Sequence, residues 1–127
     1  MMLYPKADCR HFLGCKPCPV STDCRECRGY SPWKEKILLI KTAAKGDVLR
    51  TTPLSGALKQ KYPHSRLTWL TAPDAAPLLE GNPHIDRLLA YSLESTVEIL
   101  SQRYDLAVCL DKEPHAAGLA GQVRARR

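Results

Sequence analysis

Cysteine pairs near the N-terminus are the first residues in this sequence whose spacing could do chemistry. Cys15 and Cys18 form one Cys-x-x-Cys pair, and Cys24 and Cys27 form a second. A two-residue gap lets both sulfurs of a pair reach one tetrahedral metal ion. Five of the six cysteines lie between Cys9 and Cys27, in a segment without a helical or strand period. We therefore expect a structural Zn²⁺ held by four thiolates to order this segment.

Spacing alone leaves the ligand set open, because five thiols exceed the four that Zn²⁺ needs. Cys24 and Cys27 are the first choices, followed by Cys18, with either Cys9 or Cys15 completing the set. His11 is an alternative ligand. An iron–sulfur cluster is an alternative occupant, since four thiolates hold both kinds of centre. Disulfides or unliganded thiols are the remaining alternative, which a reducing compartment disfavours.

A carboxylate in the segment KTAAKGDVLRT is the second candidate for chemistry. Asp47 follows Gly46 at an expected strand-to-helix turn. Backbone N–H groups and the positive end of the helix dipole favour a negative charge there. Such a carboxylate can act as a general base toward a hydroxyl group, and the alternative is that Asp47 only caps the helix. The segment has neither the GxGxxG nor the P-loop pattern, so nucleotide binding at this loop is not supported.

Other polar side chains flank this loop or follow a later strand. Lys41 and Lys45 could bind a phosphate or carboxylate, or could be solvated charges. Thr51 and Thr52 could be hydroxyl ligands or helix caps. Substrate contact is also expected from a dense polar set directly after a buried strand, namely Asp111, Lys112, Glu113 and His115.

Alternating apolar segments from residue 36 onward must position these side chains. Strands are expected at 36–42, 66–71, 86–91 and 104–110, with helices ending near Tyr62 and spanning 72–80, 94–102 and 113–124. This βα alternation predicts a Rossmann-like parallel α/β sheet with right-handed crossovers. Pro53 suits a first helical turn, so Thr52 is the expected N-cap unless the early turn is kinked. Ligands of such sheets bind beyond the carboxyl ends of the strands.

Composition limits the class of protein. The 127 residues suit about one domain, divided here into a Cys-rich head (1–35) and a Rossmann-like part (36–127). Neither a membrane-spanning run nor a signal peptide is visible, so we expect a soluble, cytoplasmic protein. The net charge of +6 comes from 19 Lys and Arg against 13 Asp and Glu. This charge suits an anionic membrane face or phosphorylated substrate, while the 6% aromatic content weakens a nucleic-acid interpretation.

The sequence after residue 36 resembles glycosyltransferase family 9, the heptosyltransferases of lipopolysaccharide core synthesis. The resemblance rests on KTAAKGDVLRTTPLSGALKQKYP, RLTWLT, APLLEGNPHIDRLLAY, YDLAVCLD and HAAGLAG. It implies a GT-B enzyme with two Rossmann-like domains, of which this chain would supply the acceptor side. The implied reaction is inverting, metal-independent transfer from a nucleotide-sugar such as ADP-heptose to a lipopolysaccharide or other glycan acceptor. It also implies peripheral contact with the anionic inner membrane face.

The resemblance also implies roles for particular residues. The Gly46–Asp47 pair would supply the general base at Asp47, with Thr42 and Lys45 as neighbours. The head resembles that of a less-characterised branch, in which the zinc ligands would be Cys9, Cys18, Cys24 and Cys27, with Cys15 spare.

The chain ends at QVRARR, where the family continues with another strand and a donor-binding domain. We therefore expect no turnover by this chain alone, and an open sheet edge that promotes self-association. The alternative function is a small zinc-ribbon module that contacts nucleic acid or protein through its basic head.

Overall fold

The computed structural model describes residues 33–127. The chain divides after Lys34 into two units. The predicted zinc ligands Cys9, Cys18, Cys24 and Cys27, and the alternatives Cys15 and His11, lie outside the described residues. Those predictions therefore stay predictions, and the following description concerns the second unit.

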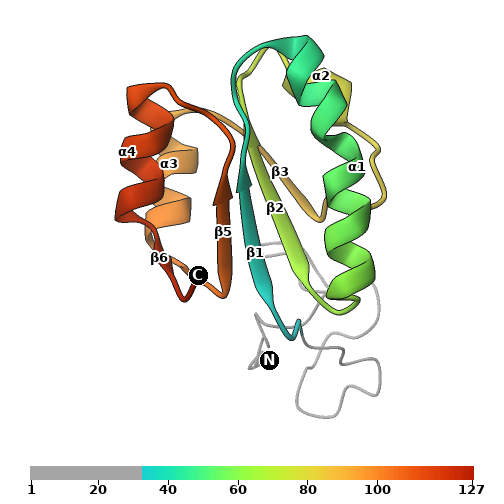
Figure 1. The fold of residues 1–127 in the computed structure, drawn as a ribbon. Coiled ribbons are helices and arrows are strands. Elements are labelled where there is room, and N and C mark those ends of the chain that lie inside the picture. Colours follow the sequence, from blue (N-terminus) through green and yellow to red (C-terminus); the bar gives the residue numbers. More distant parts are fainter. Residues whose placement is uncertain (1–32) are drawn as a thin grey trace, which may run out of the picture. The chain divides into compact units, whose positions relative to one another are not determined.

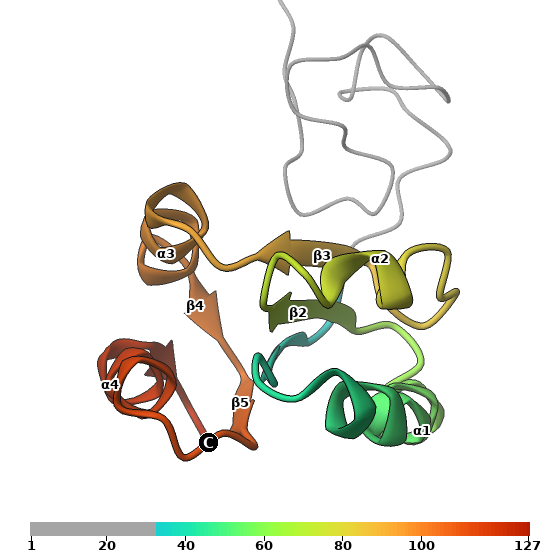
Figure 2. The same cartoon turned by 90° about the horizontal axis from the view of Figure 1, so that it is seen from above.

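A four-stranded parallel sheet forms the centre of this unit, in the order β3-β2-β1-β5. Its strands are β1 (Lys36–Ile40), β2 (Arg66–Thr71), β3 (Arg87–Ala90) and β5 (Leu106–Cys109). The helices are α1 (Lys45–Lys61), α2 (Ala76–Leu79), α3 (Leu93–Leu100) and α4 (Pro114–Gln122). Helices α1 and α2 cover one face of the sheet, and α3 and α4 cover the other (Figures 1 and 2). The predicted parallel α/β sheet with flanking helices is confirmed.

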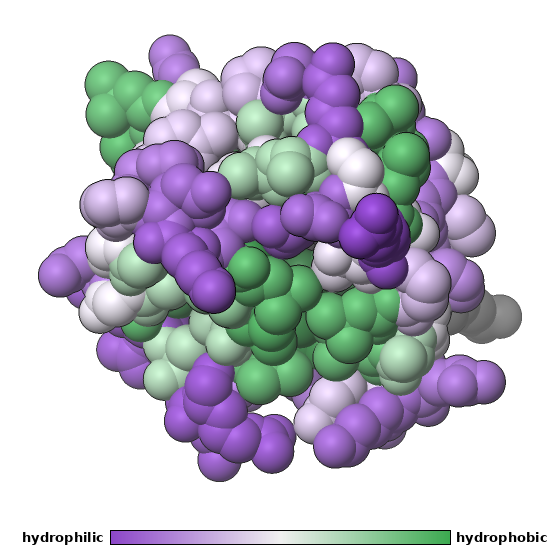
Figure 3. Space-filling model, turned by 45° about the horizontal axis from the view of Figure 1, so that its top comes forward, coloured by the Kyte–Doolittle hydropathy of each residue, from purple (hydrophilic) through white to green (hydrophobic). Residues whose placement is uncertain are grey.

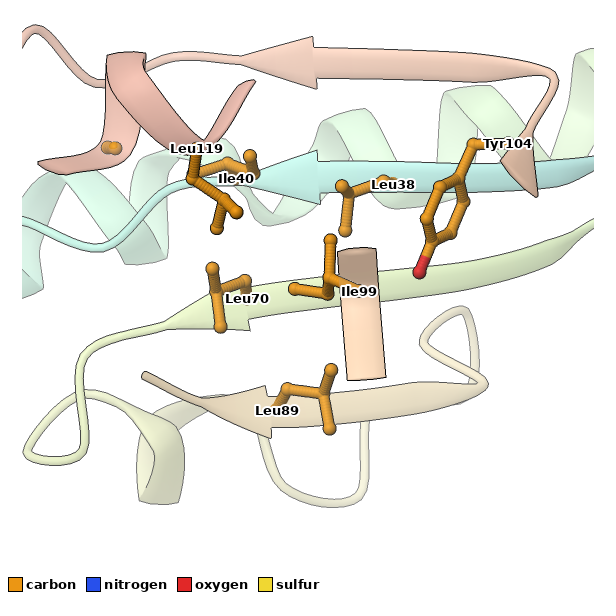
Figure 4. Close-up of a cluster of buried hydrophobic side chains, with 8 residues drawn as sticks. Leu38, Ile40, Leu70, Leu89, Ile99, Tyr104 and Leu119 are labelled. Carbon is orange, nitrogen blue, oxygen red and sulfur yellow. The ribbon is translucent and has the colours of Figure 1, made fainter. Parts of the chain in front are cut away.

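Alternation along the strands explains why both faces are apolar. On β1, Ile37 and Leu39 pack in the cluster under α1 and α2, whereas Leu38 and Ile40 pack in the cluster under α3 and α4. All four side chains are fully buried, as expected for a strand covered on both sides. Figure 4 shows the second cluster, in which Ile99 of α3 lies among side chains from β1, β2 and β3, with Tyr104 at one end.

The predicted single strand at 104–110 is wrong in one respect. Two strands occupy it, β4 (Arg103–Tyr104) and β5, separated by Asp105. Asp105 donates its backbone N–H to the Lys36 carbonyl (2.8 Å) and accepts the Lys36 N–H through its carboxylate (2.8 Å). The two strands therefore pair separately: β4 pairs with the unpredicted strand β6 (Arg124–Ala125) instead of joining the large sheet.

Pro53 lies inside α1, so the prediction of Thr52 as N-cap is wrong. The helix begins at Lys45, eight positions before the proline. Because proline has no N–H, it cannot donate to the Leu49 carbonyl one turn earlier. The Thr52 hydroxyl donates to that carbonyl instead, at 2.7 Å. The Thr52 hydroxyl thus supplies the carbonyl with a donor, while the alternative of a kinked early turn stays a prediction.

Strand β5 lies at one edge of the large sheet. Its four residues are only half-buried, and the following Leu110 is 42% exposed. Figure 3 shows an area of hydrophobic surface with hydrophilic groups around it on the face turned toward the viewer. The Ala107 N–H on this strand donates to the carbonyl of Arg127 at 2.8 Å. Self-association through this edge stays a prediction.

No helix among the described residues is long and apolar enough to cross a membrane.

Candidate active site at the carboxyl edge of the sheet

The carboxyl ends of β1 and β5 are neighbours, and one buried carboxylate joins the loops that follow them. Asp111 Oδ2 accepts hydrogen bonds from the backbone N–H and the hydroxyl of Thr42, each at 2.5 Å. Its Oδ1 accepts one from Lys41 Nζ at 2.9 Å and a long one from the Ala43 N–H at 3.5 Å. The residues that follow these two strands, Thr42 and Asp111, thus contact each other directly.

The environment of Asp111 keeps it ionised. Burial raises the pKa of this carboxyl, but the hydrogen bonds from Thr42 and Lys41 and the positive charge of Lys41 outweigh burial, and the pKa lies below its ordinary value. The side chain of Asp111 is wholly buried and that of Lys41 is 12% exposed. The interpretation of Lys41 as a solvated charge is therefore wrong, because the ammonium group is paired inside the loop.

A turn with unusual backbone geometry leads from this pair to the predicted base. Ala44 has a φ of 60°, and among residues 33–127 it is the one non-glycine residue with a positive φ. It is also the N-cap of α1, without a side-chain cap hydrogen bond. Its carbonyl accepts the first helical bond, from the Val48 N–H at 2.9 Å. The local geometry at Ala44 thus sets where α1 begins.

Asp47 lies in the first turn of α1, with a side chain that is 54% exposed. Its nearest charged partner is Arg50, at 3.6 Å on the same helix. The Thr51 hydroxyl donates to the Asp47 backbone carbonyl at 2.7 Å, so this hydroxyl binds within the helix. A Cβ atom added at Gly46 would meet nothing within 4 Å. The carboxylate of Asp47 is therefore open to a ligand from solvent.

The other predicted site residues spread around this edge. Lys45 lies 3.9 Å from Asp74, which follows β2, and both side chains are exposed. Lys112 is exposed. His115, in the first turn of α4, meets the ring of Tyr91 edge-on with centroids 5.1 Å apart. Asp74 lies in the segment after β2 that the strand-end rule indicates, whereas Tyr91, directly after β3, was not predicted as a site residue.

Two separate groups thus form at the carboxyl edge. The buried group contains Lys41, Thr42 and Asp111, and its polar atoms bind one another. The exposed group contains Asp47 and Lys45 at the start of α1, on one face of the sheet, and Lys112 and His115 at the start of α4, on the other face (Figures 1 and 2). Only the exposed group presents polar atoms to a ligand without breaking internal hydrogen bonds, so the prediction of substrate contact applies best to it.

Comparison with known proteins supports the resemblance derived from the sequence. No family model matches the chain. Lipopolysaccharide heptosyltransferase 3 of Escherichia coli strain K12 is 43% identical over 47 residues, which are 37% of this chain and 14% of that protein. A second Escherichia coli lipopolysaccharide heptosyltransferase 3 is 42% identical over 43 residues, 34% of this chain and 13% of the relative.

Solved structures show the same fold. A family 9 glycosyl transferase from Veillonella parvula DSM 2008 matches 72% of this chain and 30% of its own, with a TM-score of 0.63 and 24% identity. The Escherichia coli heptosyltransferase WaaC with ADP matches 71% of this chain and 32% of its own, with a TM-score of 0.62 and 18% identity. The chain thus spans about a third of these structures or less, and the resemblance to glycosyltransferase family 9 is confirmed over that part.

Proposed function

From the match to heptosyltransferases of glycosyltransferase family 9, we propose that residues 35–127 form the acceptor side of a sugar-transferring site. The observation that carries the proposal is Asp47, an exposed carboxylate in the first turn of α1 at the carboxyl edge of a parallel sheet. Ligands of such sheets bind at this edge. The proposed donor is a nucleotide-sugar of the ADP-heptose type, and the proposed acceptor is a lipopolysaccharide or another glycan.

In the proposed reaction, Asp47 accepts the proton of an acceptor hydroxyl. The hydroxyl oxygen forms a bond to the anomeric carbon of the donor sugar, while the bond from that carbon to the nucleoside diphosphate breaks on the opposite side. The sugar is therefore transferred with inversion. The protein's contribution is to hold the hydroxyl oxygen near both the carboxylate and the anomeric carbon.

Exposed side chains at the carboxyl edge of the sheet suit an acceptor that carries hydroxyl and anionic groups. Lys45 and Lys112 supply exposed ammonium groups, which bind phosphate or carboxylate. The Tyr91–His115 pair adds aromatic rings at the same edge of the sheet. We propose that these residues contact the acceptor, and that residues outside the matched region bind the nucleotide.

Acceptor binding by the 127-residue chain tests this proposal without requiring turnover. A lipopolysaccharide-core oligosaccharide titrated into the isotope-labelled chain should shift the amide signals of residues 45–47 and 112–115. ADP alone should leave them unchanged. Absence of oligosaccharide binding at millimolar concentration would contradict the acceptor-side assignment.

The base role needs a transfer assay, in which the chain is combined with the donor-binding part of a family 9 relative. In that assay Asp47→Asn should abolish transfer while leaving the circular dichroism spectrum unchanged. Glu94→Gln is the matched control, because Glu94 is an exposed carboxylate in the first turn of α3. Retained transfer by Asp47→Asn would remove Asp47 from the base role.

Peripheral contact with an anionic membrane is also proposed, and an exposed apolar stripe on α3 supports it. Leu93 is 77% exposed, Val97 is 58% exposed, and the spacing puts both on one helix face. Exposed Arg103 follows this helix and pairs in register with exposed Arg124. Exposed apolar side chains on a helix followed by arginines suit an anionic lipid surface.

Vesicle flotation tests the membrane contact. The chain should float with vesicles that contain anionic lipid and remain behind with purely zwitterionic ones. Val97→Ser should weaken the binding, whereas Val48→Ala, a buried change on α1, should not. Equal binding to both kinds of vesicle would contradict the charge argument.

A further inference from the structure

The buried carboxylate of Asp111 contacts the segment that leads into the proposed base. Three of its hydrogen bonds, at 2.5, 2.5 and 2.9 Å, come from two consecutive residues, Lys41 and Thr42. These donors are 69 and 70 positions away in the sequence. The carboxylate therefore fixes the exit of β1 against the exit of β5, with both backbone and side-chain donors.

The start of α1 is anchored by buried Val48, but its N-cap has no side-chain hydrogen bond. This N-cap is Ala44, and an alanine side chain has no such bond to offer. The same residue has a φ of 60°, a conformation that costs energy for a residue with a Cβ. Such a conformation persists where neighbouring contacts impose it. The bonds to Asp111 end at Thr42 and Ala43, directly before Ala44.

We propose that Asp111 is a positioning residue for Asp47: its carboxylate holds residues 41–43 so that Ala44 makes its turn and α1 begins at Lys45. This inference rests on the proposed role of Asp47 as the base. It reassigns Asp111 from substrate contact to control of the loop that carries the base. Lys41 takes part as the paired cation, so its ammonium group serves the loop rather than an anionic ligand.

The substitution Asp111→Asn would disrupt the hydrogen bonds to this side chain without changing the shape of the side chain. The carboxylate faces hydrogen-bond donors from Lys41, Thr42 and Ala43. One of the two carboxamide positions would present an N–H group to these donors, which leaves at least one of them without an acceptor. The turn at Ala44 should then relax, and the start of α1 should move.

Backbone amide spectra of the full 127-residue chain test this inference. Asp111→Asn should shift the amide signals of residues 42–48, including Gly46, Asp47 and Val48. The Thr42 signal should lose the low-field position that a short bond to a charged acceptor gives. Asp105→Asn is the matched control, because Asp105 binds the Lys36 N–H at the opposite end of the same strand pair. Its shifts should stay near residues 36 and 105.

A second control separates positioning from general stabilisation. Ile99→Val weakens the core at a fully buried side chain far from the turn in sequence. It should lower the stability without moving the signals of residues 42–48. Wild-type positions for Gly46, Asp47 and Val48 in folded Asp111→Asn would overturn the proposal, and Asp111 would then only tie two strands together.

Thr42→Val keeps the test decisive if Asp111→Asn does not fold. It removes one donor to Asp111 and retains the buried shape, so we expect smaller shifts in the same residues. If the signals of these residues do not shift at all, the proposal is overturned. The outcome is independent of the proposed function. If the wild-type chain binds no acceptor but Asp111→Asn still moves the start of α1, the acceptor-side assignment fails while the positioning of the turn stands.

Discussion

Replacement of Asp111 by alanine should destabilise this domain more than replacement of any exposed carboxylate. The substitution removes the acceptor of three short hydrogen bonds and leaves the ammonium group of Lys41 without its partner. The hydroxyl and N–H of Thr42 also lose their acceptor in a buried position. Each of these effects disfavours the folded state, because polar groups removed from water need partners.

The size of the effect can be bounded from the contacts. Each hydrogen bond to a charged group contributes about 1.5–3 kcal/mol, without strict additivity. Breaking a buried ion pair by removing one partner costs about 3–5 kcal/mol. Lys41 retains 12% exposure and can regain some hydration, so we expect a loss near the lower end, about 3 kcal/mol. That is a large part of the ~5–15 kcal/mol by which domains are usually stable.

Urea unfolding at neutral pH, followed by circular dichroism and by the fluorescence of buried Trp69, measures this loss. Asp47→Ala is the internal comparison. Its carboxylate is half exposed and its partner Arg50 is more exposed still, so we expect a change below about 1 kcal/mol. A loss below about 1 kcal/mol for Asp111→Ala, or equal losses for the two variants, would refute the reasoning.

The pH dependence gives the same prediction a second readout. Because the pKa of Asp111 is lowered in the folded chain, its contribution is fully present above the unfolded value of about 3.9. It is lost as the pH falls through the lower folded pKa. The stability difference between wild type and Asp111→Ala should therefore be constant near neutral pH and shrink in acid. A difference that grows on acidification would contradict the assigned direction.

Four further predictions follow from particular residues. Ala44→Gly should raise the free energy of unfolding by up to about 1 kcal/mol, because glycine adopts a positive φ without strain, and a lower melting temperature would contradict this. Pro53→Ala should also stabilise, by about 1–2 kcal/mol in urea unfolding, since it restores a helical hydrogen bond to Leu49. Burial of Tyr104 and the negative charge of Glu98 raise the pKa of this tyrosine to about 12. Stability should fall as the pH rises above about 10, the ordinary tyrosine value, and Tyr104→Phe should remove that dependence. Elemental analysis of chain purified without chelator should find one zinc per chain, and Cys24→Ser should lower that content; iron in place of zinc would favour the cluster alternative.

Much of the fold followed from local sequence patterns. The apolar runs at 36–42 and 66–71 predicted buried parallel strands, since no other common element is apolar on both sides over so few residues. The break at Asp105 was not predictable, because it depends on a hydrogen bond to Lys36, which is distant in the sequence. The start of α1 was predicted too late, since Pro53 is a strong local signal and the hydroxyl of Thr52 that compensates for it becomes visible only in the folded helix.

The candidate site, like the fold, could be predicted from the sequence only in part. The strand-end rule predicted that residues near Thr42, Asp47 and Asp111 would gather at one edge, and it treated the two aspartates alike. Burial separates them: Asp111 binds donors from the neighbouring loop, whereas Asp47 projects from the first turn of α1. A base must reach a substrate proton and a positioning residue must not be exposed to competing water, so each aspartate has the environment that its proposed role requires. The two roles therefore predict opposite profiles on substitution by asparagine: loss of transfer with stability retained at Asp47, and a displaced turn with stability reduced at Asp111.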